Sequence, residues 1–162
     1  RGTIAVLLVV AAISVLVATL WMPVLQIYGS SMSPTLEAGQ IVVSVKTNQL
    51  KTGEVVAFWQ GNKLLVKRVI AGPGQWVDID MDGNVTVDGK ELTEDYLDVK
   101  ALGNCDVELP HQVEESRWFL MGDNRDVSVD SRSAAIGDVS KDQIEGKIVF
   151  RIWPLKEFGS MQ

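Results

Sequence analysis

The feature that most constrains this chain is an uncharged apolar run near its amino end. No charged residue occurs from Ile4 to Leu25. At ~1.5 Å per helical residue such a run extends ~33 Å, which is enough to cross a hydrocarbon layer of ~30 Å. A cleaved signal peptide has a shorter apolar core, so a retained membrane span is favoured. We therefore expect residues 1–26 to form one transmembrane anchor.

Charge indicates how the span is oriented and which partners are excluded. Arg1 is the only charge on the amino side of the run, and the first charge beyond it is Glu37. The positive-inside tendency then favours a cytoplasmic amino end. The formal net charge of -6 leaves no basic field for nucleic acid or anionic lipid. We expect a single-pass protein of the cell membrane, attached by apolar insertion into the bilayer, with its main domain extracytoplasmic and no nucleic-acid partner.

The remainder of the chain predicts a mainly β domain. Short runs rich in valine and isoleucine are typical of strands, and Asp82-Gly83-Asn84 is a strong hairpin turn. Residues 91–115 are acidic and show no sustained period, so they indicate an irregular lobe. Helical periodicity is nearly absent outside the anchor, apart from one short turn that Ser140 can cap. The expected strands are 41–45, 54–59, 63–71, 76–80, 85–87, 117–121 and 147–153.

A serine acting as a nucleophile needs a base to take its proton, and three serines lie in GSSMSPTL directly after the apolar run. His111 is the only histidine, in an acidic loop where nothing orders an imidazole, and we interpret it as a solvated loop residue. Lys67 is the other candidate, because alternation in LLVKRVI places it on one strand face with Leu65 and Val69. The alternative is a stem that packs along the surface while its ammonium reaches water.

A lysine becomes a base only at a cost. Its ordinary pKa of ~10.4 leaves only about one amine in a thousand neutral near pH 7.4. Lowering that pKa by ~3 units costs roughly 4 kcal/mol, which the fold must supply by burial among apolar groups. Lys67 is the lysine whose sequence neighbours best provide such a setting.

The segment GDNRDVSVDSR, residues 122–132, carries a dense mixture of charges. It is either a solvated loop of weak surface ion pairs or a buried network that orients a site. Asp123, Asp126 and Asp130 match no metal-ligand spacing, and no HExxH or paired-cysteine pattern occurs. We expect no metal or cofactor, and we interpret Cys105 as an incidental loop thiol.

Three stretches together resemble the type I signal peptidases, membrane-bound serine proteases that remove signal peptides. GSSMSPTL is similar to the serine box of that family, LLVKRVIAGPG to its lysine box, and MGDNRDVSVDSR to its third box. Their order, the preceding span and the closing IVFRIWP also fit. Lysine rather than histidine before Arg68 resembles the bacterial branch, and Gly29 together with a short lobe resembles its Gram-positive members.

The resemblance implies roles for particular residues. Ser31 corresponds to the nucleophile and Lys67 to its general base. Ser128 corresponds to the serine that hydrogen-bonds the lysine amine, and Asp130 with Arg132 to a supporting ion pair. Such an enzyme forms an acyl-enzyme and cleaves after small residues, in a small-x-small pattern.

Further residues follow from the same resemblance. Arg68 has a structural role. Gly29 stands where Gram-negative members have a serine that binds the oxyanion, so backbone N–H groups at Gly29 and Ser31 are the expected oxyanion region. The substrate would lie extended along a strand edge. The expected walls of the substrate pocket are Ile27, Met32, Leu36, Leu65 and Val66.

The resemblance also implies a fold: a signal-peptidase/LexA-like β-barrel core with a small variable lobe, preceded by one transmembrane helix. We expect the catalytic β core at residues 27–74 and 117–155, the lobe at 75–116 and a tail at 156–162. The partners implied are signal peptides of secreted preproteins and the lipid bilayer, and the family suggests a monomer. The alternative is a membrane-tethered β-barrel interaction module without catalytic activity.

Overall fold

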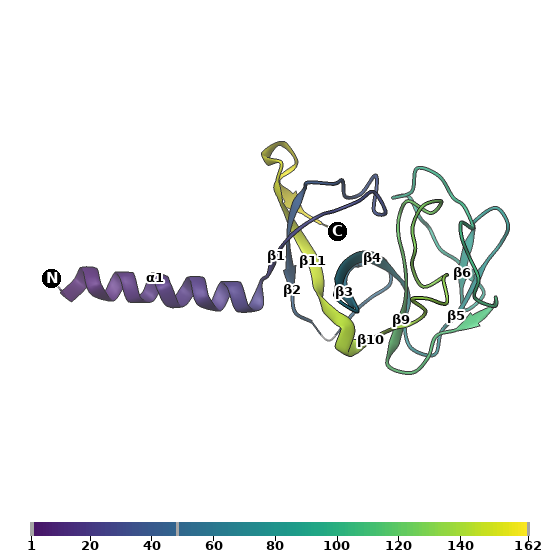
Figure 1. Cartoon of the computed structure of the whole chain (residues 1–162), viewed down its shortest axis with the longest axis horizontal. Coiled ribbons are helices and arrows are strands. Elements are labelled where there is room, and N and C mark those ends of the chain that lie inside the picture. The colour runs from purple at the N-terminus through teal and green to yellow at the C-terminus, as the bar shows by residue number, and fades with distance from the viewer. Residues whose placement is uncertain (1, 48, 162) are drawn as a thin grey trace.

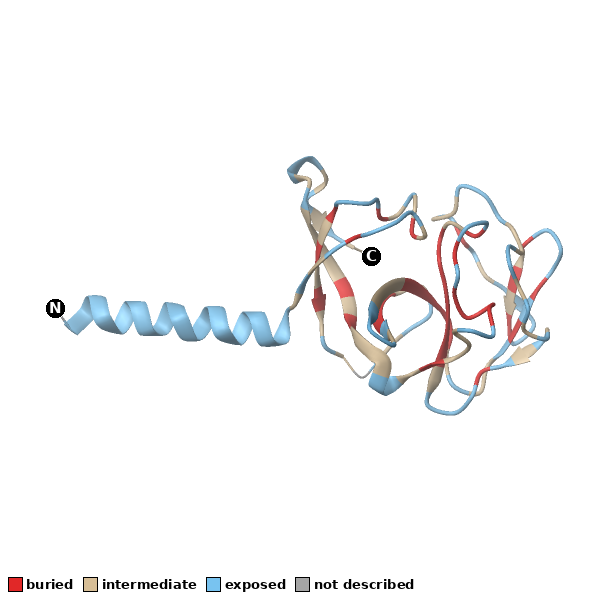
Figure 2. Ribbon diagram, viewed as in Figure 1, coloured by how far each residue is buried: buried red, intermediate tan, exposed pale blue. Residues whose placement is uncertain are grey.

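The computed structural model, which describes residues 2–47 and 49–161, consists of one long helix followed by a mainly β domain (Figure 1). Helix α1, Gly2–Trp21, has no buried residue although its mean hydropathy is 2.8. Figure 2 shows it exposed along its whole length, standing away from the β domain. An apolar helix that the protein itself leaves uncovered fits a lipid environment, so the single N-terminal apolar helix expected from the sequence is confirmed.

The helix ends earlier than the apolar run does. We expected residues 1–26 to form the anchor, but α1 ends at Trp21. Pro23 has no N–H for the helical ladder and forces the residue before it toward extended geometry. The next residues form strand β1, Val24–Gln26, which pairs with β2, Ile41–Val45. The last apolar residues of the run therefore belong to the β domain.

The remaining strands form two sheets. The larger has eight strands in the order β1-β2-β11-β3-β4-β9-β10, with β12 paired to β11, and the smaller has the order β7-β6-β5-β8. The bounds are β3 Val55–Gln60, β4 Lys63–Ala71, β5 Trp76–Ile79, β6 Val85–Val87, β7 Lys90–Glu91, β8 His111–Gln112, β9 Arg117–Met121, β10 Val139–Ser140, η1 Lys141–Gln143, β11 Ile144–Trp153, η2 Leu155–Glu157 and β12 Gly159–Ser160.

The mainly β prediction is confirmed, but the expected barrel is not closed. Among residues 2–47 and 49–161, no strand pair joins β1 to β10, so both remain edges of the larger sheet. Each of the seven expected strands is present, with ends that differ by at most three residues. The two-residue strands β7, β8, β10 and β12 were not expected, because segments this short carry no period to detect.

Strand β4 contributes both to the core of the larger sheet and to the core that this sheet shares with the lobe. It pairs with β3 on one side and with β9 on the other, so it is central in the larger sheet. Its carboxyl-terminal half is buried on both faces. One face packs with Val56 and Phe58 of β3, whereas the end of the strand contributes Ile70 and Ala71 to the core of the lobe. A lysine in this half has little room to reach bulk water.

The smaller sheet packs against strands β4 and β9 of the larger one. Its valines share a cluster with Phe119 and Met121 of β9, so the lobe has no separate core. The hairpin turn at Asp82 is present, with Gly83 at φ 82° and the Asp80 carboxylate accepting backbone N–H groups of Asp82 and Asn84. Apart from β7 and β8, the segment 91–115 is irregular as expected. The division at residues 74/75 and 116/117 stays a prediction.

Candidate active site

Residues 29–36 (GSSMSPTL), which we call the serine turn, form a tight loop that buried apolar side chains fix at both ends. Ile27 precedes it, and Met32 and Leu36 follow within it, all three at most 4% exposed. Gly29 adopts φ 74°, a conformation that favours glycine. These constraints leave Ser31 half-buried at the rim of a pocket.

The third motif holds the serine turn through its backbone. The carbonyl oxygen of Ser31 accepts a hydrogen bond of 3.0 Å from the backbone N–H of Asn124. The side-chain amide of Asn124 donates to the carbonyl oxygen of Ser30 at 3.2 Å. A Cβ on Gly122 would collide with both Ser128 Oγ and the Ser31 carbonyl oxygen. Glycine at this position therefore lets the serine turn and Ser128 approach from two sides.

Lys67 is buried, with 3% of the residue exposed. It lies opposite Val56 of β3, and its same-face neighbours Leu65 and Val69 pack in the cluster that contains Val56, as alternation predicts. At this exposure the stem of Lys67 does not lie along the surface, so that part of the alternative does not hold. Lys67 also has no carboxylate within ion-pair distance among the described residues, so its charge is not neutralised by a direct partner.

Burial lowers the pKa of Lys67 from 10.5 to about 8. The carboxylates of Asp130 and Asp123 oppose this change, whereas the positive charge of Arg132 adds to it. At pH 7.4 a group with that pKa is neutral in roughly one molecule in five. An appreciable fraction of Lys67 is therefore in the neutral form near neutral pH.

The ion pair expected between Asp130 and Arg132 is formed and fully buried. Arg132 donates from Nε to Asp130 Oδ1 and from Nη2 to Oδ2, both at 2.9 Å. Burial alone would raise the pKa of Asp130, but the hydrogen bonds from Arg132 and Ser128 lower it below its usual range. Ser128 Oγ donates to Asp130 Oδ2 at 2.6 Å. Its lone pairs are left as acceptors, but no hydrogen bond joins the Lys67 amine to Ser128 or Ser31 among the described residues, so the contact with the amine stays a prediction.

Arg68, the neighbour of Lys67, connects the three motifs. Its guanidinium donates to Asp123 Oδ1 at 2.8 Å and Oδ2 at 2.6 Å, to the Gly53 carbonyl oxygen at 2.6 Å and to Thr35 Oγ1 at 3.2 Å. The ring of Tyr96 covers it at 3.8 Å from the ring centroid. The sequence indicated a structural role for Arg68 but did not identify these partners.

The charged segment 122–132 is a buried network, so the solvated-loop interpretation is wrong. Asp123, Arg125, Asp130 and Arg132 are each at most 2% exposed. Arg125 pairs with Glu94 of the acidic lobe, and both side chains are buried. Sequence reasoning missed Glu94, because nothing in the pattern distinguishes it among the 21 acidic residues.

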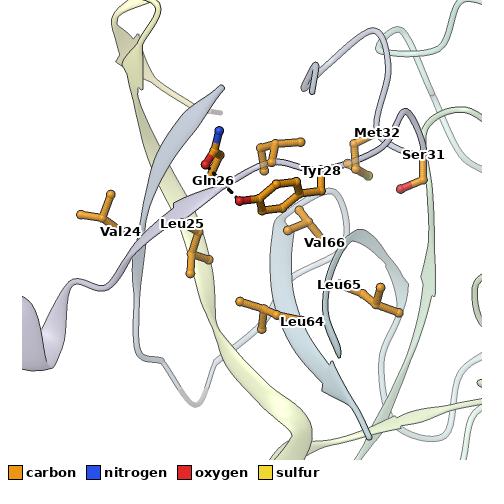
Figure 3. A pocket seen from close by; sticks show the side chains of 10 residues that line it. Val24, Leu25, Gln26, Tyr28, Ser31, Met32, Leu64, Leu65 and Val66 are labelled. Carbon is orange, nitrogen blue, oxygen red and sulfur yellow. Dashed lines mark hydrogen bonds between the residues drawn. The ribbon is translucent and has the colours of Figure 1, made fainter. Parts of the chain in front are cut away.

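A pocket of about 280 Å³ opens beside Ser31. Figure 3 shows Ser31 and Met32 at one end and Val24 at the other, with Leu64, Leu65 and Val66 of β4 along one side. Four of the five expected wall residues line it. Leu36 does not, because it is fully buried in the core beneath. The lining residues are Val24, Leu25, Gln26, Ile27, Tyr28, Ser31, Met32, Leu64, Leu65 and Val66.

Comparison with known proteins identifies the family. The model of "Signal peptidase, peptidase S26" matches residues 1–153. The chain belongs to this family. It is 39% identical over 153 residues to signal peptidase IB of Staphylococcus aureus, covering 82% of this chain and 78% of that protein. Signal peptidase I of Bacillus licheniformis is 33% identical over 145 residues, covering 80% and 75%.

A solved structure agrees. The signal peptidase I of Enterococcus faecalis matches with a TM-score of 0.51 and 25% identity, covering 63% of this chain and 98% of that one. The chain is therefore a bacterial, Gram-positive-like member of a peptidase family, and nothing favours the alternative of an interaction module without activity. Family membership together with helix α1 makes it a membrane-anchored hydrolase of peptide bonds.

His111 lies outside the site of this S26 peptidase. His111 is not a solvated loop residue: it lies in β8, its Nε2 is 2.9 Å from the buried Asp138 Oδ1, and its ring packs against Phe119. It does not contact Ser31. Among residues 2–47 and 49–161, no group of three or more histidine, cysteine or acidic residues is arranged to hold a metal ion.

Proposed function

We propose that this peptidase removes signal peptides from exported preproteins, with Ser31 as the nucleophile and Lys67 as its general base. The observation that carries the proposal is a buried lysine without an ionic partner among the described residues, in the strand whose Leu65 and Val66 line the same pocket as Ser31. The names of the related bacterial enzymes support this substrate class.

The reaction would proceed in two halves. Neutral Lys67 takes the proton of Ser31 Oγ while that oxygen bonds to the scissile carbonyl carbon. The tetrahedral intermediate collapses as the C–N bond breaks, and the proton on Lys67 passes to the departing amine. Water then attacks the acyl-enzyme, giving its proton to Lys67, and the Ser31 oxygen leaves with that proton. Lys67 returns to its neutral form after each half.

Backbone groups of the serine turn would stabilise the oxyanion. Gly29 turns the chain with its positive φ, and the N–H of Ser31 donates to no acceptor within the described residues. A free N–H beside the nucleophile can donate to the negative oxygen of the intermediate. These features support the oxyanion role of Gly29 and Ser31.

The pocket supports a substrate with small residues before the cleaved bond. Most of its lining residues are apolar, although polar groups also contribute to the wall, and its volume of about 280 Å³ is small for several large side chains. Strand β1 forms one wall and is also an edge of the larger sheet. An extended peptide can add to such an edge through backbone hydrogen bonds while alternate side chains enter the pocket.

Location follows from the anchor and the substrate. Signal peptides reach the outer surface of the membrane, and the positive-inside tendency supports a β domain on that side. A peptidase held at the same surface meets its substrate within the plane of the bilayer. We further propose that the protein works as a monomer, because the pocket and the three motifs come from one chain.

The decisive experiment uses purified full-length protein in lipid vesicles with a preprotein. Wild-type protein should cleave it at one bond after a small residue, as read by mass spectrometry, and Ser31→Ala should not. Ser30→Ala is the matched control, because Ser30 is an exposed neighbour in the same turn. Cleavage by Ser31→Ala, or equal loss in both variants, would contradict the assignment.

The pH profile tests the base independently. Because the base must be unprotonated, activity should fall as the pH drops through the pKa of Lys67, about 8. A limb near pH 4 would instead indicate a carboxylate as the base.

A further inference from the structure

The acidic lobe reaches into the network behind the active site through Glu94 and Tyr96. Glu94 is fully buried at its side chain and pairs with Arg125, whose Nε donates to the carbonyl oxygen of Gly122 at 3.1 Å. Tyr96 donates its hydroxyl proton to Glu94 Oε1 at 3.0 Å. The lobe is thus attached directly to the segment that holds the serine turn.

The second attachment is the contact of Tyr96 with Arg68. The edge of the Arg68 guanidinium is occupied by acceptors from Asp123, Gly53 and Thr35. Its flat face carries no donor, so only a π surface or apolar group can cover it well. The Tyr96 ring does so at 3.8 Å. A cation held against an aromatic face away from water is stabilised, and its ion pair with Asp123 is kept from solvent.

The contacts among Tyr96, Arg68 and Asp123 connect to the serine turn on both sides of Ser31. Asn124, whose N–H holds the Ser31 carbonyl oxygen, directly follows Asp123. Thr35, at the other end of the serine turn, donates its hydroxyl to Asp123 Oδ2 at 2.5 Å. The contacts therefore run from Tyr96 through Arg68 and Asp123 to both sides of Ser31.

We propose that Tyr96 is a positioning residue of the peptidase reaction: its ring holds the Arg68–Asp123 pair, and that pair sets Ser31 against Lys67. The inference rests on the proposed roles of Ser31 and Lys67. Tyr96 itself does not line the pocket beside Ser31, so it acts through Arg68 rather than on the substrate. The lobe that varies in this family is then part of the catalytic support.

Removing the Tyr96 ring should change both kcat and the pH dependence of cleavage. Without it, water reaches Arg68, the pair with Asp123 loosens, and the serine turn shifts relative to Lys67. A displacement on the order of 1 Å costs up to about 100-fold in rate. Asp123 would also be less neutralised, and its carboxylate raises the pKa of Lys67, which faces Asp130 and Arg132 as well. The acid limb should therefore move to higher pH, while KM is little changed because the pocket is intact.

The test compares Tyr96→Leu with Tyr96→Phe in the full-length protein, using a fluorogenic signal-peptide substrate. Tyr96→Leu should lower kcat by about 10- to 100-fold and shift the acid limb upward. Tyr96→Phe keeps the aromatic face and should retain most of kcat with an unshifted limb. Asp95→Asn, an exposed neighbour, is the matched lobe control and should behave as wild type.

Several results would overturn the inference. Wild-type kcat in Tyr96→Leu, equal losses in Leu and Phe variants, or a loss confined to KM would each do so. If Tyr96→Leu does not fold by circular dichroism, Tyr96→Met fills the space without a π face and is subject to the same criteria. Ser31→Ala, assayed in parallel, separates the two claims: residual cleavage there defeats the proposed function, whereas unimpaired Tyr96→Leu beside an inactive Ser31→Ala defeats only this inference.

Discussion

Two kinds of buried cation lie side by side in this molecule. Three arginines each have a buried carboxylate partner, whereas Lys67 of β4 has none within ion-pair distance among the described residues. The arginines form a framework that stays charged, because a guanidinium does not lose its proton in proteins. The lysine has a pKa lowered to about 8. The pairs are Arg68–Asp123, Arg125–Glu94 and Arg132–Asp130.

The paired arginines support the structure, whereas the unpaired lysine has the properties that the proposed reaction needs. A buried charge with good partners keeps its charge and fixes neighbouring segments, although replacing the whole pair by apolar groups is often tolerated. A buried amine without a partner is forced toward its neutral form, which is unfavourable for stability but is what a general base requires. Substitutions that exchange these two situations should therefore have opposite effects on activity and stability.

The largest effect on activity is expected when the unpaired lysine is replaced by arginine. Lys67→Arg keeps the positive charge but cannot give it up, so it cannot accept the serine proton. Preprotein cleavage should fall by about 10⁴-fold or more. The measurement is a single-turnover assay of the purified variant with circular dichroism to verify folding. Residual activity within a factor of ten of wild type would exclude Lys67 as the base.

The next effect is on stability, from breaking a paired cation. Arg132→Met leaves the Asp130 carboxylate buried without its partner, which should lower the free energy of unfolding by about 3–5 kcal/mol. Because Arg132 lowers the pKa of Lys67 and Asp130 raises it, the acid limb should also move to higher pH. Urea unfolding and a pH–rate profile measure the two consequences. An unchanged unfolding midpoint would show that the pair is not needed.

Removing the unpaired cation should raise the free energy of unfolding, which is the opposite of the change expected for Arg132→Met. Lys67→Met keeps the apolar stem, so the variant should be inactive yet more stable than wild type by about 1–3 kcal/mol at neutral pH. Below pH 8 the folded and unfolded states both carry the charge, and the full penalty applies. As pH rises from 8 to 10.5 the folded wild type is already neutral, so the gain should fade. If the stability gain of Lys67→Met instead grew between pH 8 and 10.5, the pKa of Lys67 would not be lowered in the folded state.

The smallest effect is expected for an exposed ion pair. Lys100 lies 3.5 Å from Glu91 on the lobe, and both side chains are over a third exposed. Lys100→Gln should change the free energy of unfolding by less than about 1 kcal/mol and leave cleavage unaltered. It serves as the baseline for Arg132→Met in the same urea titration. A comparable loss in both variants would mean that burial does not distinguish the pairs.

Much of this arrangement could be predicted from the sequence, because it is local. The seven strands and the face that carries Lys67 follow from alternation, and the single helix follows from the apolar run. The end of that helix was missed because Val24 and Leu25 are as apolar as the span, while Pro23 is the physical stop. Composition alone does not distinguish a lipid-facing residue from one in a sheet.

The partners in the buried network could not be predicted, because they join distant segments. Tyr96 and Glu94 reach Arg68 and Arg125 only when the lobe packs against the rest of the domain, and Thr35 reaches Arg68 only when the serine turn does so. No spacing in the sequence encodes such contacts. The same reason applies to His111, whose partner Asp138 lies 27 residues further along the chain. Family resemblance supplied the residues of the site but not the groups that support them.

The connection between α1 and β1 has a mechanical consequence. Only Met22 and Pro23 separate the two elements; Met22 N–H still bonds to Ala18, and the Pro23 carbonyl oxygen accepts from Ser44 of the sheet. Two hydrogen-bonded residues cannot act as a flexible linker, so the β domain is held close to the end of α1. If the proposed function holds, the pocket beside Ser31 then lies at a set distance from the membrane surface, and that distance limits which bond of a membrane-bound substrate reaches it.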